Sequence, residues 1–283
     1  MNPQAEAFKA QARAAWDQSA EGWHRHAPAL RRWLHEATPA MLEMAGIGPG
    51  QRVLDVAAGA GDQTLDIARR VGPSGHVLAT DLSPAILALA QESAARAGLS
   101  QVSTQVADGE ELDVEPGSFD AAVCRLGLML FPDPARAVRA MHRALRPHGG
   151  VCTMVFGWAE RNPCITTVVR AAFEHAGLPP PDATKPGGLL SLGQPGMVDR
   201  LFESAGFRDV ATTLVDAPFR LPTTHDYVEF VRSSASPIQQ VLGRLDAAAQ
   251  RRAWDDIEAR LDRFMTSEGF VGPNELALTA GRR

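Results

Sequence analysis

The chain has 283 residues, of which 45% are hydrophobic and 22% charged, with a formal net charge of -5 and a sequence pI near 5.9. This length and composition are typical of one large globular domain, or of one domain with a sizeable insertion. The mildly acidic charge, without a Lys/Arg cluster, argues against nucleic acid as a partner, because nucleic-acid binding depends on basic patches.

The N-terminal stretch "MNPQAEAFKAQARAAWDQ" is polar and Ala-rich and lacks the hydrophobic region of a secretory signal. The sequence contains no run of about 18 apolar residues, so we expect no membrane span. The three cysteines, Cys124, Cys152 and Cys164, have no CxxC spacing, which is typical of reduced thiols. These features predict a cytoplasmic protein without a metal site.

Taken in chain order, the first half of the sequence alternates helices with strands after an N-terminal helical stretch. Residues 4–20 are rich in helix formers, and this pattern extends through Trp33 to Met44, before the break "GIGPG". The segments that follow predict a strand at 52–57, a helix at 61–72, a strand at 76–82, a helix at 84–98 capped by Ser83, a strand at 101–108, a strand within 118–128, an amphipathic helix within 133–150 and a strand at 151–158.

The second half alternates less regularly. It predicts a helix at 163–177, a Pro/Gly-rich loop at 177–188, a helix within 194–207, a sixth strand at 208–221, mostly helix over 223–266 and a last strand at 274–283. Alternating strands and helices indicate βαβ units. We therefore predict an α/β fold: a doubly wound, mostly parallel, seven-stranded Rossmann-like sheet, with N-terminal helices and helical insertions that form a substrate cap. The expected divisions are an N-terminal lid (1–45), a cofactor-binding core (46–158) and the remaining strands with cap insertions (159–283).

The stretch "VLDVAAGAGD" joins the first strand to its helix, and ligands of open α/β sheets bind at the carboxyl ends of the strands. Gly59 and Gly61 allow a tight turn and a close backbone approach. A phosphate-binding P-loop would carry a lysine, whereas this turn carries Asp55 and Asp62. Acids at this position favour a ligand with positive charge.

Two further acids end the next two strands. Asp81 stands about 20 residues after Gly61, the position of the acid that binds ribose hydroxyls in nucleotide-binding βαβ units. Asp108 ends the third strand, where it can accept a hydrogen bond from an adenine amine. A ligand that combines adenine, ribose and a cationic tail is S-adenosylmethionine (SAM).

These residues resemble the class I SAM-dependent methyltransferase family. "VLDVAAGAGD" is similar to its first motif, "ATDLSP" to its second, "VADGEEL" to its third, "FDAAVCRLGLMLFPDP" to its fourth and "LRPHGGVCTMVFG" to the strand that follows. The resemblance covers roughly residues 50–157 and is nearest to the small-molecule branch, similar to the ubiquinone/menaquinone-biosynthesis C-methyltransferases. Its departures are "RPHGG", where the family usually has PGG, and Arg125, at a position where members vary.

The resemblance implies SAM as cofactor, S-adenosylhomocysteine as product and no metal. In the family, the turn that matches Gly59–Gly61 holds the amino-acid tail with support from the acid at Asp55, while Asp81 binds the ribose and Asp108 the adenine. The implied cofactor-binding residues are Asp55, Ala57, Gly59, Gly61, Asp81, Leu82, Ala107, Asp108, Gly109 and Arg125.

Residues for the acceptor and for catalysis are less defined. Methyl transfer is an in-line displacement governed by alignment, although a phenol or enol needs a general base. Candidates for a catalytic role are His24, Arg125, His225 and Tyr227. Arg125 interrupts an apolar strand, so it either pairs with an acid or lines the methyl-transfer pocket.

Candidates for the acceptor pocket are aromatic. Trp16 and Trp23 share one helix face, and they either pack on the sheet or cover the cofactor, where a cation above an aromatic ring is attracted. Trp158 and Tyr227 lie in segments that are apolar enough for a small, partly hydrophobic acceptor.

The sequence thus predicts SAM-dependent C-, O- or N-methylation of a small organic acceptor, by a monomer or homodimer. One alternative is a non-catalytic SAM-binding regulatory or assembly protein. Another is an NAD(P)-dependent oxidoreductase, which is disfavoured because Thr64 stands where a third glycine belongs and the only tyrosine forms no Tyr-x-x-x-Lys pair.

Overall fold

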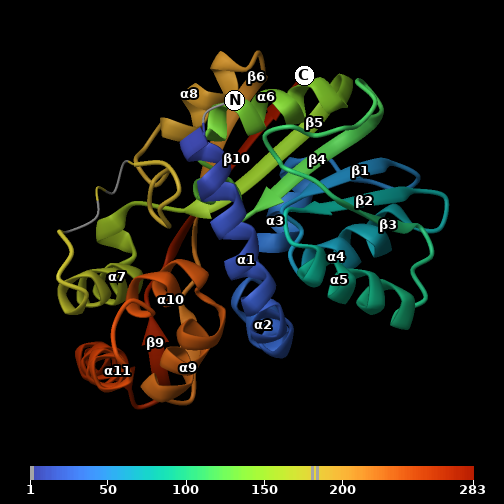
Figure 1. Ribbon diagram of the computed structural model, residues 1–283. Coiled ribbons are helices and arrows are strands. Elements are labelled where there is room, and N and C mark those ends of the chain that lie inside the picture. Colours follow the sequence, from blue (N-terminus) through green and yellow to red (C-terminus); the bar gives the residue numbers. More distant parts are fainter. Residues whose placement is uncertain (1–2, 180–181, 183–184) are drawn as a thin grey trace.

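The computed structural model describes residues 3–179, 182 and 185–283. Its elements, labelled as in Figure 1, are α1 (Pro3–Arg25), α2 (Ala27–Trp33), α3 (Ala37–Met44), β1 (Arg52–Val56), α4 (Asp62–Val71), β2 (His76–Asp81), α5 (Pro84–Arg96), β3 (Val102–Val106), β4 (Phe119–Arg125), η1 (Leu128–Leu130), α6 (Pro134–Ala144), β5 (Leu145–Phe156), η2 (Ala159–Arg161), α7 (Pro163–His175), α8 (Met197–Ser204), β6 (Arg208–Asp216), β7 (Phe219–Leu221), α9 (Thr224–Ser234), α10 (Ser236–Leu242), α11 (Ala247–Leu261), η3 (Asp262–Phe264), β8 (Met265–Thr266), β9 (Gly269–Gly272) and β10 (Glu275–Arg282).

A seven-stranded sheet with the order β3-β2-β1-β4-β5-β10-β6 forms the centre of the molecule. The strands from β3 to β5 are parallel to one another, whereas β10 is antiparallel to both β5 and β6. Helices α3, α4 and α5 lie on one side of the sheet, and α6 and α8 lie on the other (Figure 1). This arrangement confirms the predicted doubly wound, mostly parallel α/β sheet.

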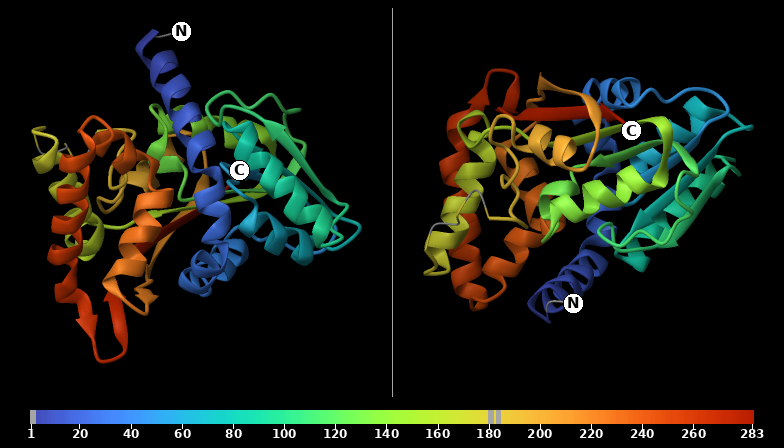
Figure 2. Two further views of the ribbon diagram at one scale, coloured as in Figure 1. Left: turned by 60° about the horizontal axis from the view of Figure 1, so that its bottom comes forward. Right: turned by 90° about the horizontal axis from the view of Figure 1, so that it is seen from above.

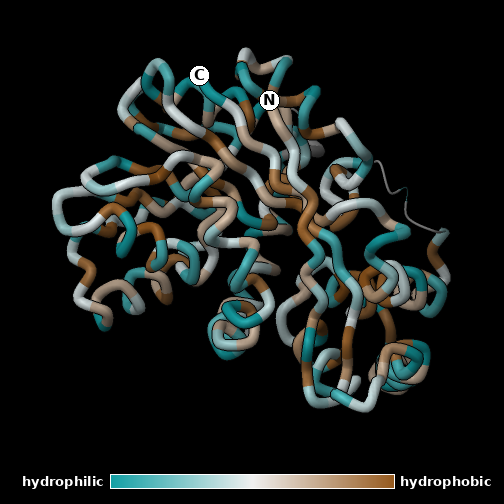
Figure 3. Tube along the Cα trace, turned by 180° about the vertical axis from the view of Figure 1, so that it is seen from behind, coloured by the Kyte–Doolittle hydropathy of each residue, from teal (hydrophilic) through white to brown (hydrophobic). Residues whose placement is uncertain are grey.

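The sheet is covered on both faces, and its central strands are apolar for that reason. Leu54, Val123, Met154 and Leu278, on four neighbouring strands, are all fully buried. Hydrophobic segments accordingly gather along the strands, and hydrophilic ones lie in the outer turns (Figure 3).

The helices that follow the strands begin at residues that the sequence marks. Ser83 Oγ accepts a hydrogen bond from the Ile86 N–H at 3.1 Å, which confirms the predicted cap of α5, and Pro84 takes the first helical position. Asp133 caps α6 in the same way, with its Oδ1 accepting from the Arg136 N–H.

The predicted strand over 208–221 is wrong as one element. The chain leaves the large sheet at Ala217 and Pro218, where proline has no N–H for a strand ladder, and β7 then pairs with β9 in a separate sheet of order β7-β9-β8. The prediction for the fifth strand is also corrected: β5 begins at Leu145 and contains an irregularity, within which His148 adopts a positive φ of 67°.

Helices α7, α9, α10 and α11 pack on one another and, with the three-stranded sheet, form a unit that we name the helical cap. The long helix α1 runs between this cap and the core: it contacts α5 on one side and α9 and α10 on the other (Figures 1 and 2). Part of the predicted loop at 177–188 falls outside the described residues.

Over the described ranges we find no helix with the length and hydrophobicity that crossing a bilayer requires.

Candidate active site

A cavity lies at the carboxyl ends of the parallel strands, where the sequence analysis places the ligand. We name it the first cavity. Its walls come from the loops after β1, β2, β3 and β4, and α1 covers it. The predicted cofactor residues that line it are Ala57, Gly59, Asp81, Leu82, Ala107, Asp108, Gly109 and Arg125, and α1 adds Phe8, Lys9, Ala12, Trp16 and Trp23.

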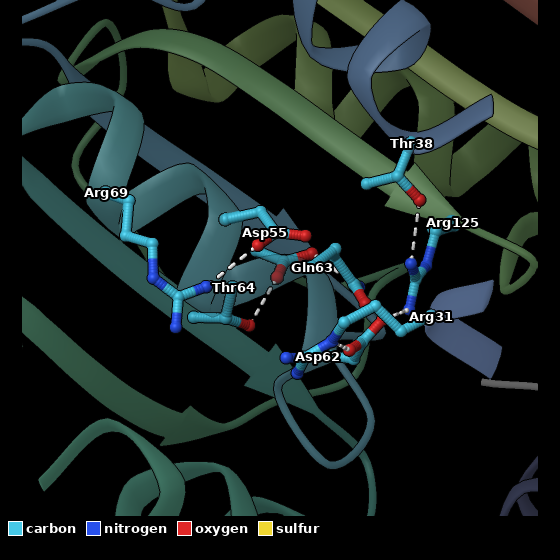
Figure 4. Close-up of polar contacts among 9 residues, drawn as sticks. Arg31, Thr38, Asp55, Asp62, Gln63, Thr64, Arg69 and Arg125 are labelled. Atoms are coloured by element: carbon cyan, nitrogen blue, oxygen red, sulfur yellow. Dashed lines mark hydrogen bonds and ion pairs between the residues drawn. The ribbon is translucent and has the colours of Figure 1, made fainter. Parts of the chain in front are cut away.

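Asp55 does not line this cavity, in contrast to its predicted contact with the cofactor. The side chain is fully buried, and its Oδ2 and Oδ1 accept hydrogen bonds from Thr64 Oγ1 at 2.6 Å and Gln63 Nε2 at 3.0 Å (Figure 4). Burial raises the pKa of Asp55 to about 6, although these two hydrogen bonds oppose the shift. Asp55 therefore holds the first turn of α4, and Gln63 in that turn lines the cavity.

The two glycines of the turn have different reasons to be glycine. Both have positive φ, 57° at Gly59 and 85° at Gly61, but only Gly59 lines the cavity. A Cβ at Gly61 would lie 2.8 Å from the Ala90 Cβ, so this glycine lets α4 approach α5. Ala57, which also lines the cavity, adopts a positive φ of 55° without being glycine.

The sequence analysis expected Asp62 to make the turn negatively charged, but the structure pairs this acid with two arginines. Arg31 Nε and Arg125 NH2 each donate to its carboxylate at 2.9 Å, and Arg125 NH1 donates to Thr38 Oγ1 (Figure 4). Asp62 and Arg125 are both more than nine-tenths buried as side chains. Arg125 pairs with an acid, as one of its two alternatives predicts. It also lines the first cavity, but a place in the methyl-transfer pocket stays a prediction.

Asp81 connects two of the loops that form the cavity. Its Oδ2 accepts from the Gly59 N–H and its Oδ1 from the Ser83 N–H, both at 3.0 Å. Burial raises the pKa of this carboxyl, while hydrogen bonds from the backbone of Ser83, Gly59 and Leu82 lower it in part. Each carboxylate oxygen keeps the capacity to accept a further hydrogen bond.

Lys9 is a residue of this site that the sequence analysis missed. Its Nζ lies 2.6 Å from Asp108 Oδ2 and 2.5 Å from Glu110 Oε2. Burial alone would lower the pKa of Lys9, but its hydrogen bonds to Asp108 and Glu110 outweigh this effect and raise it. No local pattern identifies such a partner, because 99 positions separate Lys9 from Asp108.

A second cavity adjoins the first and is lined mainly by the helical cap. Trp16, Trp23, Leu126 and Leu130 line both cavities, so the two meet at these residues. The rings of Trp16 and Trp23 lie 6.0 Å apart, centroid to centroid. Each of the two predictions for these tryptophans has support, because Trp23 packs against the hydrophobic core and both rings line the cavities. Tyr227 lines the second cavity, and its role in an acceptor pocket stays a prediction.

Three predicted residues lie elsewhere. Trp158 is 48% exposed and lines neither cavity, because it follows β5 on the surface. His225 is exposed at the start of α9, where its Nδ1 lies 3.2 Å from Glu258 Oε2. His24 is in the last turn of α1 and also lines neither cavity.

A search of the described residues for three or more His, Cys, Asp or Glu side chains placed to bind a metal ion finds none.

Comparisons with known proteins agree with this geometry. A family profile described as a methyltransferase domain matches residues 53–149. Nocamycin O-methyltransferase of Saccharothrix syringae is 31% identical over 243 residues, which cover 82% of this chain and 84% of that protein. The ubiquinone/menaquinone biosynthesis C-methyltransferase UbiE of Pseudomonas paraeruginosa is 35% identical over 116 residues, 41% of this chain and 45% of that protein.

Among solved structures, the YcgJ protein of Bacillus subtilis superposes with a TM-score of 0.59 at 18% identity, covering 88% of this chain and 98% of that one, which shows a shared fold. The shared fold, the family profile over the core and a relative matched along most of its length confirm the predicted resemblance. The chain belongs to the class I SAM-dependent methyltransferases, in a family of enzymes that act on small molecules.

Proposed function

We propose that this chain transfers the methyl group of SAM to a small, partly hydrophobic organic acceptor, at carbon, oxygen or nitrogen. The observation that carries the proposal is the junction of the two cavities. The first has carboxylates at the strand ends, and the second is largely apolar. They meet at Trp16, Trp23, Leu126 and Leu130, where a methyl donor in one would face an acceptor in the other.

The residues of the first cavity fit SAM. Asp81 accepts the Gly59 N–H on one oxygen and the Ser83 N–H on the other, and the lone pairs that remain on the carboxylate can accept from the vicinal hydroxyls of a ribose. Asp108 can accept from the adenine amine beside its contact with Lys9. Arg31, Arg125 and Asp62 together carry one excess positive charge, which suits the carboxylate of the amino-acid tail.

When bound, SAM would supply an electrophilic methyl group with a neutral leaving group. The contribution of the chain is then alignment and exclusion of water. Helix α1 covers the first cavity with Phe8, Trp16 and Trp23, and the tryptophan rings suit a neighbouring sulfonium. Holding donor and acceptor in line replaces a bimolecular encounter, which accounts for much of the rate in such a displacement.

The structure favours a mechanism without a dedicated histidine base. His24 and His225 line neither cavity. Burial raises the pKa of Tyr227 well above its ordinary value, so the hydroxyl stays protonated and is available to donate a hydrogen bond. Arg125 is engaged by Asp62 and Thr38 and stays charged. We infer that alignment, and not proton abstraction by these residues, carries the reaction.

We also propose a division of labour along the chain. Residues 1–45 act as the lid, residues 46–158 bind the cofactor, and residues 159–283 complete the sheet and form the acceptor cap. The positions of α1 over the first cavity and of the cap around the second support this division.

The test is calorimetric titration with S-adenosylhomocysteine, with NADH in parallel. We expect micromolar binding by the wild type and a loss of about 1–3 kcal/mol in Asp81→Ala, since a hydrogen-bonding carboxylate is removed. Asp66→Ala is the matched control, because Asp66 lies on α4 and its ion-pair partner among the described residues is Arg69. Release of S-adenosylhomocysteine across an acceptor panel then tests catalysis.

Two results would count against the proposal. A preference for NADH would indicate an oxidoreductase. Cofactor binding without turnover on any acceptor would indicate a SAM-binding regulatory or assembly protein.

A further inference from the structure

The second cavity carries information on the acceptor. No Asp, Glu, Lys, Arg or His side chain is among the described residues that line it. Its walls are mostly aromatic and aliphatic: Phe219 lies between the rings of Tyr227 and Phe230, 5.3 and 5.0 Å from their centroids, and Trp33 is 4.9 Å away. A charged acceptor would lose its hydration here and gain no counter-ion, so these walls disfavour charge.

Within these apolar walls, three polar groups have no hydrogen-bond partner among the described residues. Asn274 is 5% exposed, and while its Nδ2 donates to the Gly272 carbonyl at 3.1 Å, its Oδ1 accepts nothing. Exchanging the amide atoms would set two oxygens against each other, so the Gly272 contact assigns the orientation. The Trp23 Nε1 is likewise buried without a partner. The Tyr227 hydroxyl is not one of these buried orphan atoms, but Tyr227 lines the cavity, and among the described residues we find no hydrogen bond to its hydroxyl.

Buried polar groups are almost always satisfied, so a set of them around one cavity indicates a ligand that pairs with them. One of the three is an acceptor, Asn274 Oδ1, and the other two, on Trp23 and Tyr227, are donors. The complementary ligand presents one O–H or N–H and at least one oxygen lone pair. A neutral hydroxyl group supplies both functions.

The size of the cavity points to a compact occupant. Its volume is about 100 Å³, less than the roughly 150 Å³ of an apolar cavity that holds a benzene molecule, so a ring would also occupy the junction with the first cavity at Trp16 and Leu130. The flat aromatic side chains of the walls also match a ring in shape.

Resting on the methyl transfer proposed above, we propose that the second cavity selects a neutral, ring-containing acceptor with a hydroxyl group, a phenol being the simplest case. Its O–H donates to Asn274 Oδ1, and its oxygen atoms accept from Tyr227 and Trp23. Carboxylate, phosphate and ammonium acceptors are disfavoured, because no charged side chain is among the described residues that line the walls.

The experiment uses the full chain loaded with S-adenosylhomocysteine and titrates it calorimetrically with matched probes. 4-Ethylphenol donates and accepts, 4-ethylanisole only accepts, and 1,4-diethylbenzene does neither. Tyramine and 4-hydroxyphenylacetate add a charge of either sign. We expect affinity to fall roughly 3- to 10-fold at each step from phenol to anisole to hydrocarbon, and no measurable binding of the charged probes.

Two variants test which residue causes each of these differences in affinity. Tyr227→Phe keeps the ring and removes one hydrogen-bond donor. It should therefore reduce the difference in affinity between 4-ethylanisole and 1,4-diethylbenzene, and leave the affinity for 1,4-diethylbenzene unchanged. Asn274→Ala should abolish the difference in affinity between 4-ethylphenol and 4-ethylanisole. Trp158→Phe, on the exposed surface, is the matched aromatic control and should behave as the wild type.

Equal affinity for phenol and anisole, or binding of a charged probe as tight as that of the phenol, would overturn the inference. The inference would also be overturned if both variants kept the wild-type differences in affinity among the three neutral probes. S-Adenosylhomocysteine is titrated first, and the probes are also tested on the unloaded protein. Failure of cofactor binding therefore contradicts the proposed function, whereas cofactor binding without probe selectivity contradicts only this inference.

Discussion

Lys9 Nζ lies 2.6 Å from Asp108 Oδ2, so an ammonium group of the first helix contacts an acid in the loop after β3. A second contact acts beside it: Asp17 Oδ1 accepts from Ser83 Oγ at 2.5 Å, at the start of α5. Together, Lys9 and Asp17 connect α1 to two of the loops that form the first cavity. The covering helix is thus held by the same loops that are proposed to bind the cofactor.

Lys9→Met should accelerate dissociation of S-adenosylhomocysteine. The substitution leaves Asp108 and Glu110 without their shared cation, so α1 is held less firmly over the cavity. We expect a roughly tenfold faster dissociation in stopped-flow tryptophan fluorescence, equivalent to about 1.4 kcal/mol. Arg13→Met removes one positive charge from the exposed side of the same helix and should match the wild type. Equal dissociation rates for both variants would contradict the role of Lys9.

Gly61→Ala should destabilise the protein more than Gly59→Ala. Both substitutions place a side chain at positive φ, which costs about 1 kcal/mol. At Gly61 the new methyl group also collides with Ala90, at 2.8 Å, whereas at Gly59 only Ile86 Cδ1 comes within 3.9 Å. We expect Gly61→Ala to lose about 2 kcal/mol more free energy of unfolding in urea denaturation. Equal losses would contradict the packing role of Gly61.

Asp55→Asn should change how stability depends on pH. The folded pKa of Asp55 is about 6, above its ordinary value of 3.8, so the folded state binds the extra proton between these values. The stability that Asp55 contributes is therefore present below pH 4 and is lost as the pH rises through 6. Relative to Asp55→Asn, the wild type should lose about 2–3 kcal/mol between pH 4 and pH 7.

Urea denaturation of both proteins at several pH values measures this loss. Asp66→Asn, at an exposed ion pair, is the control, and its free energy of unfolding should depend on pH in the same way as that of the wild type. Parallel curves for Asp55→Asn would show that Asp55 does not titrate in this range.

Arg125→Met should be more damaging than Arg69→Met. It removes a buried partner of Asp62 and leaves that carboxylate with Arg31 alone, so we expect a loss of about 2–4 kcal/mol in the free energy of unfolding. Arg69 pairs with Asp66 on the surface, where such a pair contributes about 0–1 kcal/mol. Chemical denaturation measures the free energy of unfolding of the two variants. Similar losses would show that the ion pair between Arg125 and Asp62 contributes little to stability.

The parallel part of the fold could be predicted because its signals are local. Asp81 at the end of β2, Asp108 just after β3 and the cap at Ser83 lie within a few residues of the elements that they mark. The small sheet β7-β9-β8 could not be predicted in this way, since its strands are short and come from separate parts of the chain. Pro218 was the one local sign that the sixth strand ends early.

The site was also predicted in part, because some of its residues are marked by local sequence signals and others are placed by tertiary contacts. Strand-end loops point toward one edge of a parallel sheet, which brings Asp81 and Asp108 to one cavity. Whether Asp55 faces this cavity or α4 depends on hydrogen bonds from Gln63 and Thr64, which local pattern does not reveal. The contact between Lys9 and Asp108 depends on tertiary packing.

The place of β10 in the sheet bears on how the molecule is assembled. Every other strand precedes it in the sequence, yet it lies between β5 and β6, and β6 pairs with β10 alone in the large sheet. Strand β6 therefore has no ladder to join until residues 275–282 are synthesised and inserted. The parallel half can form earlier from pairings that are nearer in sequence, which the chain completes at lower entropic cost. Folding is thus expected to end with the antiparallel edge, and the loop with Asn274 would complete the wall of the second cavity in the same late step.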